Sequence, residues 1–170
     1  MHGTSPKICL KTQSFGRRLA LVCLLAGFVT ACERFSPTRP SSSSSGNLSA
    51  DLSFCADEVN RYRASVGFPP LSRSADLEAF AAQAADNDGR NHQPHHWFAM
   101  TNGGGTARAE NEILWWSGYG VRSVIEQGLQ QMWQSGPGGE HYGIMVGQFS
   151  QIGCGIFVNG SEVTVAQDFS

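Results

Sequence analysis

The sequence predicts an α+β domain in which helices pack over a small antiparallel sheet. Three segments carry apolar residues at helical spacing, and they are residues 52–66, 74–89 and 121–133. The end of the chain reads instead as two strands, Gln151 to Val158 and Glu162 to Phe169. Asn159-Gly160 between them is a strong hairpin signal, because a type I′ turn needs positive φ at both central residues.

The first 31 residues are typical of an export signal. Arg17-Arg18 precedes an apolar stretch, Leu19 to Val29, that is too short to span a bilayer comfortably. The stretch ends in Thr30-Ala31-Cys32, and a small residue before a cysteine resembles the lipobox of bacterial lipoproteins. That resemblance implies cleavage before Cys32 and acylation of its sulfur, which would anchor the protein to the bacterial cell envelope. The alternative is an ordinary signal peptide with a chance cysteine.

Residues 32–47 are expected to be a tether and residues 48–170 the folded domain. Pro37 to Gly46 is rich in serine and proline, which cannot bury enough apolar surface to order themselves. The formal net charge of -2, without a basic stripe, gives no electrostatic argument for nucleic acid as a partner.

Cys55 and Cys154 are the cysteines that remain in the folded domain. An exported domain meets an oxidising environment, so we predict that the two form a disulfide. Closing a loop of near 100 residues stabilises a domain by roughly 4–5 kcal/mol in the chain-entropy model. The alternative is two separate buried thiols.

The first two predicted helices have clear signals at their ends. Gly67 and Pro69-Pro70 end the first one. Ser74 is the predicted N-cap of the second, and Asn87 to Gly89 its end. The alanines on the apolar face of the second helix predict close packing against a flat surface.

Between the helical segments, residues 90–108 have no clear period and are expected to form a long loop. Ala109 to Trp116 is predicted to be a short strand. Ser123 and Glu126 have capping-box spacing at the start of the third helix. His141 begins a short helix or turn ahead of the final strands.

Several stretches, taken in order, resemble the CAP superfamily, which groups cysteine-rich secretory, antigen 5 and pathogenesis-related proteins with bacterial SCP-like members. They are VNRYRASVGFPPL (Val59 to Leu71), PHHWF (Pro94 to Phe98), AENE (Ala109 to Glu112), MWQSGPG (Met132 to Gly138), HYGIM (His141 to Met145), GCGIF and VAQDF. The resemblance covers nearly all of residues 48–170 and implies a three-layer α-β-α sandwich.

Members of this family often carry two histidines and two glutamates that line a cleft. The resemblance places His141 at one histidine position and Glu110 at one glutamate position, with Glu112 as a near rival. The other histidine falls in the 92–96 loop, where His95 fits the spacing best and His96 is second.

The second glutamate of the family is missing here, because the corresponding segment reads Trp133-Gln134-Ser135. Glu140, next to His141, is one replacement, and Glu112 is another. His92 is expected to be a solvated loop histidine.

The resemblance implies two functions for this cleft. The first is ligand binding by an exported, membrane-anchored protein, with a lipid or other small apolar molecule, a peptide or a glycan as ligand. Zinc or another divalent metal, held by His95 and His141 with a carboxylate, would accompany it. The alternative is a metal-dependent, peptidase-like hydrolase that uses the same groups as acid and base. A purely structural envelope protein is a third reading. The chain has no HExxH motif and no nucleophile elbow.

Overall fold

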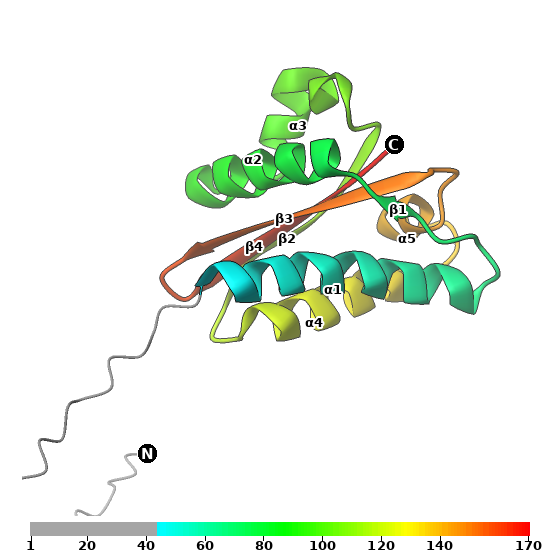
Figure 1. Ribbon diagram of the computed structural model, residues 1–170, viewed down its shortest axis with the longest axis horizontal. Helices are drawn as coiled ribbons and strands as arrows, with labels where there is room; N and C mark the ends of the chain where they lie inside the picture. The colour runs from blue at the N-terminus through cyan, green and yellow to red at the C-terminus, as the bar shows by residue number, and fades with distance from the viewer. Residues whose placement is uncertain (1–43) are drawn as a thin grey trace, which may run out of the picture. The chain divides into compact units, whose positions relative to one another are not determined.

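Helices cover both faces of a four-stranded sheet in the computed structural model, which describes residues 44–170 (Figure 1). The elements are α1 (Ser44–Ser65), β1 (Ser72–Arg73), α2 (Ala75–Asn91), α3 (His96–Thr101), the 3-10 helix η1 (Asn102–Gly105), β2 (Ala109–Ser117), α4 (Val121–Gln134), α5 (Glu140–Met145), β3 (Gln151–Asn159) and β4 (Glu162–Phe169). The predicted signal segment 1–31 and Cys32 lie outside the described residues. Among the described helices, none combines the length and apolar character that crossing a bilayer requires.

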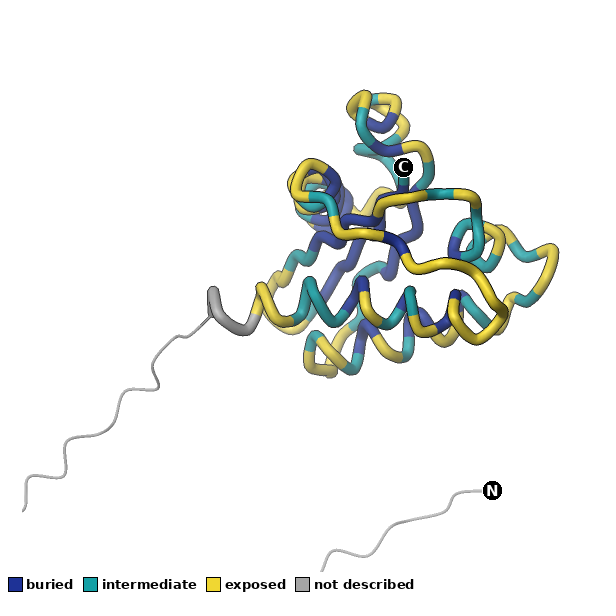
Figure 2. The backbone as a smooth tube through the Cα atoms, turned by 45° about the vertical axis from the view of Figure 1, so that its right-hand side comes forward, coloured by how far each residue is buried: buried dark blue, intermediate teal, exposed yellow. Residues whose placement is uncertain are grey.

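The predicted three-layer α-β-α sandwich is confirmed. Helices α2 and α3 lie on one face of the sheet, and α1 and α4 lie on the other (Figure 1). The strand order is β1-β3-β4-β2, and β4 pairs antiparallel with both β3 and β2. The two-residue strand β1, which pairs parallel with β3, was not predicted, because two residues have no periodicity. Buried residues concentrate on the strands between the helix layers (Figure 2).

Helix α2 lies directly against strand β3, as its alanine-rich face predicts. A Cβ on Gly155 would lie 2.0 Å from the main-chain carbonyl carbon of Ala81, and a Cβ on Gly153 would lie 2.2 Å from that of Leu77. Only glycine permits a helix to approach a strand this closely. These two residues therefore set the distance between α2 and the sheet.

Helix α2 also runs further than predicted, to Asn91. Gly89 was expected to end the helix, but it lies inside it and is buried. A Cβ at this position would lie 2.6 Å from Cδ1 of Phe157. The glycine therefore makes room for an aromatic ring, and the helix ends at His92, whose φ of 52° is left-handed.

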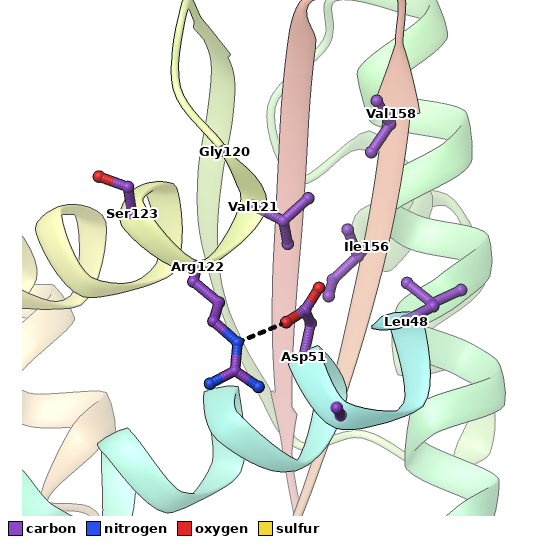
Figure 3. Close-up of a pocket in the computed structure, with 9 residues that line it drawn as sticks. Leu48, Asp51, Gly120, Val121, Arg122, Ser123, Ile156 and Val158 are labelled. Carbon is purple, nitrogen blue, oxygen red and sulfur yellow. Dashed lines mark hydrogen bonds and ion pairs between the residues drawn. The ribbon is translucent and has the colours of Figure 1, made fainter. Parts of the chain in front are cut away.

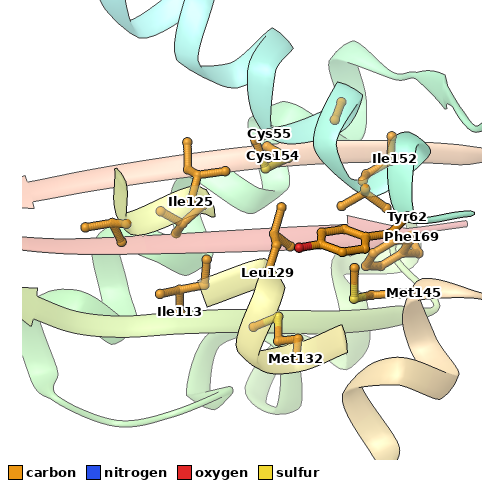
Figure 4. Close-up of a cluster of buried hydrophobic side chains, with 14 of the residues drawn as sticks. Cys55, Tyr62, Ile113, Ile125, Leu129, Met132, Met145, Ile152, Cys154 and Phe169 are labelled. Carbon is orange, nitrogen blue, oxygen red and sulfur yellow. A yellow bond between two sulfur atoms is a disulfide. The ribbon is translucent and has the colours of Figure 1, made fainter. Parts of the chain in front are cut away.

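The opposite face of β3 is bonded covalently to helix α1. Cys55 and Cys154 form the predicted disulfide, with their Cα atoms 6.4 Å apart. The bond lies within the main hydrophobic core between the sheet and the α1–α4 layer (Figure 4). Fully buried members of this core include Val59, Ile125, Leu129, Met145, Ile152 and Phe169. The disulfide therefore joins the first described helix to the strand that carries the glycines.

The predicted hairpin turn and the predicted capping box both lie in the expected elements, but their geometry differs from the prediction. The β3–β4 hairpin pairs Asn159 with Glu162, so Gly160 and Ser161 are the central turn residues. Only Gly160 has a positive φ, which is the φ pattern of a type II′ turn and not of the predicted type I′. Helix α4 begins after Gly120, so Ser123 is not its N-cap. The Ser123 hydroxyl instead accepts a hydrogen bond from Gln127.

The segment 90–108 is not one long loop, since it contains α3 and η1. Helix α3 has only six residues, which is too few for the sequence to show a helical period. It is held by Asp88 of α2, whose carboxylate accepts hydrogen bonds from the main-chain N of Trp97 at 3.0 and 3.3 Å. The contact comes from another element, which explains why the sequence alone did not predict this helix.

A pocket of about 880 Å³ lies between the start of α1, the start of α4 and strand β3 (Figure 3). Its walls are largely apolar, with Val121, Ile156 and Val158 among them. Arg122 crosses it to form an ion pair with Asp51 at 2.9 Å. No histidine lines it, so it is separate from the residues predicted to form the functional cleft.

Replacing Gly155 with alanine is expected to lower the free energy of unfolding by at least about 2 kcal/mol, because the new Cβ overlaps main-chain atoms of α2 that cannot move alone. Denaturant unfolding followed by circular dichroism measures the change. Gly143→Ala is the control, since Gly143 is exposed in α5 and a Cβ there meets nothing within 4 Å. Equal stability of the two variants would contradict this account of the α2–β3 contact.

Candidate functional site

Strand β2 supplies the polar groups of the site, and it sends them to opposite faces of the sheet. Side chains alternate along a strand, so Glu110 and Glu112 share one face and Asn111 lies on the other. Glu110 pairs across the strands with Asp168, and Asn111 pairs with Gln167. The sequence Glu-Asn-Glu therefore places two carboxyls under α2 and α3, and one amide toward α5.

His95 is held by both glutamates. Its Nδ1 lies 2.9 Å from Oε1 of Glu110 and 3.6 Å from Oε2 of Glu112. Its main-chain N–H donates to Oε2 of Glu112 at 2.7 Å. The φ of His95 is 53°, in the left-handed region that non-glycine residues rarely occupy. The bond to Glu112 stabilises this backbone conformation, and such constrained residues cluster at functional sites.

His141, in the first turn of α5, is held from the other side of β2. Its Nδ1 lies 3.0 Å from Oδ1 of Asn111, whose Nδ2 donates to the main-chain carbonyl of His141 at 3.1 Å. A carbonyl can only accept, so the second bond fixes which atom of the amide faces the ring. The neutral ring therefore carries its proton on Nδ1, which leaves Nε2 as a free acceptor.

His95, Glu110 and His141 line one pocket of about 380 Å³. Its remaining lining residues are Phe98, Ala109, Glu140 and Ile144. The two histidines come from different helix layers, α2–α3 and α4–α5, and β2 is the terminal strand of the sheet between them. The pocket therefore lies at the edge of the sheet where the two layers meet.

A second pocket, of about 440 Å³, adjoins the first at His141, which lines both. Its walls combine the apolar side chains of Ile113, Trp116 and Met132 with the polar side chains of Glu112 and Gln131. Ser135, from the segment where the sequence resemblance leads us to expect a second glutamate, also lines this pocket. His141 thus stands between two pockets that each combine acidic and apolar side chains.

The other two loop histidines point elsewhere. Nδ1 of His96 lies 3.1 Å from Oδ1 of Asn87 on α2. His92 stacks on Trp115 with ring centroids 4.9 Å apart, and it pairs with Glu162 at 3.2 Å. Neither lines the pocket of His95.

Four carboxyl groups are buried beneath His95, and sequence reasoning missed two of them. Asp88 and Asp168 are fully buried, and the glutamates of β2 are only 5–6 % exposed. A signal was available, because Asp88 continues the buried face of Ala81 and Ala84, and Asp168 shares a face with Ala166 on β4. Both oxygens of Asp168 lack a hydrogen-bond partner among the described residues.

Burial makes these carboxyls weak acids. It raises the pKa of Glu112 to about 8, with the charge of Glu110 as the next cause, and that of Asp168 to about 9. Burial also raises the pKa of Glu110 and of Asp88. The hydrogen bond to Glu110 raises the pKa of His95. Near neutral pH Glu112 and Asp168 therefore retain their protons, and the hydrogen bond to Glu110 favours the charged form of the His95 ring.

His95, Glu110 and Glu112 could together hold a divalent metal ion. One ligand atom each from His95, Glu110 and Glu112 lies within 4.8 Å of the other two, and His141 is not part of this group. Oε2 of Glu110 and Oε1 of Glu112 have no hydrogen-bond partner among the described residues. One imidazole and two carboxylates are a donor set that zinc accepts.

The pKa shifts predict that stability falls as pH rises. The folded state keeps protons on Glu112 and Asp168 up to about pH 8 and 9, whereas the unfolded chain loses them near pH 4. Between these values the folded state binds more protons, so the free energy of unfolding should drop by at least about 2 kcal/mol from pH 5 to pH 9.

Guanidinium unfolding at pH 5, 7 and 9 measures this dependence. Asp168→Asn should flatten it, because the amide cannot ionise. Asp57→Asn, at an exposed position on α1, should leave it unchanged. A free energy of unfolding that is constant or rises over this range would contradict the prediction.

The contacts of Asn111 predict the tautomer of His141. Nitrogen-15 spectra should show the neutral ring protonated on Nδ1, and Asn111→Ala should move the proton population toward Nε2, the form that neutral histidine adopts without a partner. His92, which does not contact Asn111, should keep its spectrum in this variant. A His141 ring protonated on Nε2 in the unaltered protein would show the orientation to be wrong.

Comparison with known proteins agrees with this architecture. Residues 56–169 match the model of the cysteine-rich secretory protein family, CAP. A cysteine-rich secretory protein of Staphylococcus aureus matches at a TM-score of 0.51 and 12% identity over 78% of this chain and 41% of its own. An extracellular SCP-domain protein of Bacillus anthracis matches at 0.51 and 16% over 79% and 45%.

The chain thus spans under half the length of these two proteins, and their likeness shows the fold alone. An outer surface protein of Borrelia burgdorferi matches at a TM-score of 0.48 and 16% identity, over 71% of this chain and 92% of its own. A comparison with curated proteins found no match. Since the family model covers most of the described domain, the chain belongs to the cysteine-rich secretory protein family, CAP.

Proposed function

We propose that this protein is an exported, lipid-anchored CAP-domain protein that binds a ligand in the pocket of His95, Glu110 and His141. One observation carries the proposal. Two histidines from different helix layers line one pocket, beside a His–Glu–Glu group with two unpaired carboxylate oxygens. Buried polar groups without partners are costly, and a bound ligand or ion would satisfy them.

A divalent metal ion is part of this proposal, with His95, Glu110 and Glu112 as its ligands. Zinc bound there would polarise a ligand carbonyl or lower the pKa of a bound water. His141 is then the neighbouring group, because it is not part of the three-residue cluster and its Nε2 is a free acceptor. Glu140 supplies a further carboxylate at the pocket, as a replacement for the family glutamate that is missing from Trp133-Gln134-Ser135.

The two adjoining pockets support an amphipathic ligand. Each pocket has an acidic side chain beside an apolar wall, which includes Phe98 and Ile144 in the pocket of His95 and Trp116 and Met132 in the pocket beyond His141. A small apolar molecule with a polar end, a peptide with an apolar side chain, or a glycan stacked on Trp116 would each match this combination of polar and apolar walls.

Export and anchoring rest on separate observations. The signal-like segment 1–31 and the lipobox-like Ala31-Cys32 support them, and so does the Cys55–Cys154 disulfide, which suits an oxidising compartment. The similar protein of Bacillus anthracis is described as extracellular. The tether predicted for residues 32–47 is then limited to residues 32–43, because helix α1 begins at Ser44.

A metal-dependent hydrolase is the second candidate function. The observation that favours it is the free Nε2 of His141, which can accept a proton from a water molecule in the pocket. Binding alone remains the better supported function, because Ser135 has replaced the carboxylate that the family places there.

Zinc titration by calorimetry tests the proposed site. The full-length chain should bind one zinc ion, and His95→Ala and Glu112→Gln should each weaken binding by at least about tenfold, since each removes a ligand. His141→Ala should change zinc affinity little. His92→Ala, outside the pocket, is the matched control.

Unchanged zinc affinity in His95→Ala would refute this metal site. The same protein, incubated with a peptide library, separates the two functions. Cleavage that needs zinc and disappears with a chelator and in His141→Ala would establish the hydrolase, and an intact library would leave binding as the function.

A further inference from the structure

Most arginine side chains of the described domain form ion pairs with carboxylates. Residues 44–170 contain six arginines and no lysine. Four of the arginines form ion pairs with carboxylates, namely Arg61 with Glu58, Arg73 with Glu78, Arg90 with Asp86 and Arg122 with Asp51. Arg63 and Arg108 form none with any carboxylate of the described residues.

These two arginines line the same pocket, which has a volume of about 490 Å³. No acidic side chain is among its lining residues, and Phe68 and Phe149 form aromatic walls. Ser170 also lines it, but its main-chain oxygen accepts hydrogen bonds from the N–H groups of Ser150 and Gln151. The pocket shares no residue with the two pockets beside His141.

Arg63 is a fixed cation at the base of this pocket. Its residue is 1 % exposed, and its guanidinium donates from Nε to the carbonyl of Pro69 at 2.9 Å. Its Nη1 donates to the carbonyls of Met145 and Gly147 at 2.7 and 3.0 Å. These carbonyls orient the group without neutralising its charge. Its Nη2 has no acceptor among the described residues, so two N–H donors remain available.

Arg108 is exposed at the rim of the pocket and directly precedes strand β2 in the sequence. Its Cζ lies 5.7 Å from the ring centroid of Phe149, and the Cζ of Arg63 lies 5.7 Å from that of Phe68. The pocket therefore alternates guanidinium groups with aromatic rings. A planar guanidinium matches the geometry of phosphate and carboxylate, and aromatic walls bind an apolar group attached to them.

We propose that the pocket of Arg63 and Arg108 is a second binding site, which takes a phosphate monoester attached to an aromatic or other apolar group. Arg63 binds the phosphate through its free Nη2 donors, and Arg108 adds a second positive charge from the rim. Phe68 and Phe149 enclose the apolar group. Phosphate is favoured over a carboxylate because its three oxygens can reach both guanidinium groups.

Phenyl phosphate, titrated into the nitrogen-15-labelled full-length chain, is the test. The main-chain amide signals of Gly147, Gln148 and Ser150 should shift in a saturable manner. Inorganic phosphate and phenol should each bind at least about tenfold more weakly, since each lacks one half of the ligand. Added salt should weaken binding of phenyl phosphate, because the guanidinium groups act through charge.

Arg108→Ala should weaken phenyl phosphate binding by about tenfold, the usual loss of one charge-assisted contact. It should fold normally, because the Arg108 side chain forms no hydrogen bond with the described residues. Arg90→Ala is the matched control, since Arg90 also lies over a phenylalanine ring, at 4.6 Å from that of Phe157, but is paired with Asp86. It should bind phenyl phosphate as the unaltered protein does.

Dihexanoyl phosphatidic acid, in the same titration, distinguishes the source of the phosphate. Tighter, Arg108-dependent binding of this lipid would identify a lipid headgroup, and tighter binding of phenyl phosphate would identify a soluble ester. The proposal is overturned if neither compound shifts the three amides. It is also overturned if phenol binds as tightly as phenyl phosphate, or if Arg108→Ala and Arg90→Ala bind equally well.

Discussion

The alternation of side chains across strand β3 is the constraint on which the rest of the fold depends. In Gly153-Cys154-Gly155, the glycines face helix α2 and allow its backbone to touch the strand. The cysteine faces the other way and bonds covalently to Cys55 of helix α1. Three consecutive residues therefore attach both helix layers to one strand, by steric contact on one face and by a disulfide on the other. The position of α2 then determines where Asp88 and helix α3 can lie.

The same alternation organises the candidate site on strand β2. Glu110 and Glu112 hold His95 from one face, and Asn111 holds His141 from the opposite face. The helix layer that carries His95 and the one that carries His141 need not contact each other, because side chains of the same strand position both histidines. The pocket forms at the edge of the sheet, where groups from both layers meet. A CAP domain can thus assemble a two-histidine pocket without any long continuous motif.

Ionisable side chains without a full set of opposite charges are buried in two separate parts of the domain. Asp88, Asp168 and the two glutamates are buried together under α2 and α3, where desolvation raises the pKa of each carboxyl. The unpaired guanidinium group of Arg63 is buried elsewhere, among carbonyl groups. Both arrangements lower the stability of the folded state, since the buried carboxyls outnumber their cationic partners and Arg63 has no carboxylate partner. Such departures from complete pairing are expected where a protein binds something else.

The sequence alone determined the three long helices and the final strands, because these depend on local spacing, and short motifs identified His95, Glu110 and His141 as candidates. It also indicated the disulfide, because only Cys55 and Cys154 remain in the exported domain. It did not determine that Asp88 and Asp168 join the site, or that Glu112 supports His95. Those contacts link elements that are distant along the chain, and periodicity reports only neighbours within one helix or strand. The tertiary structure decided them, because only the close approach of α2 to the sheet brings these carboxyls to the same place.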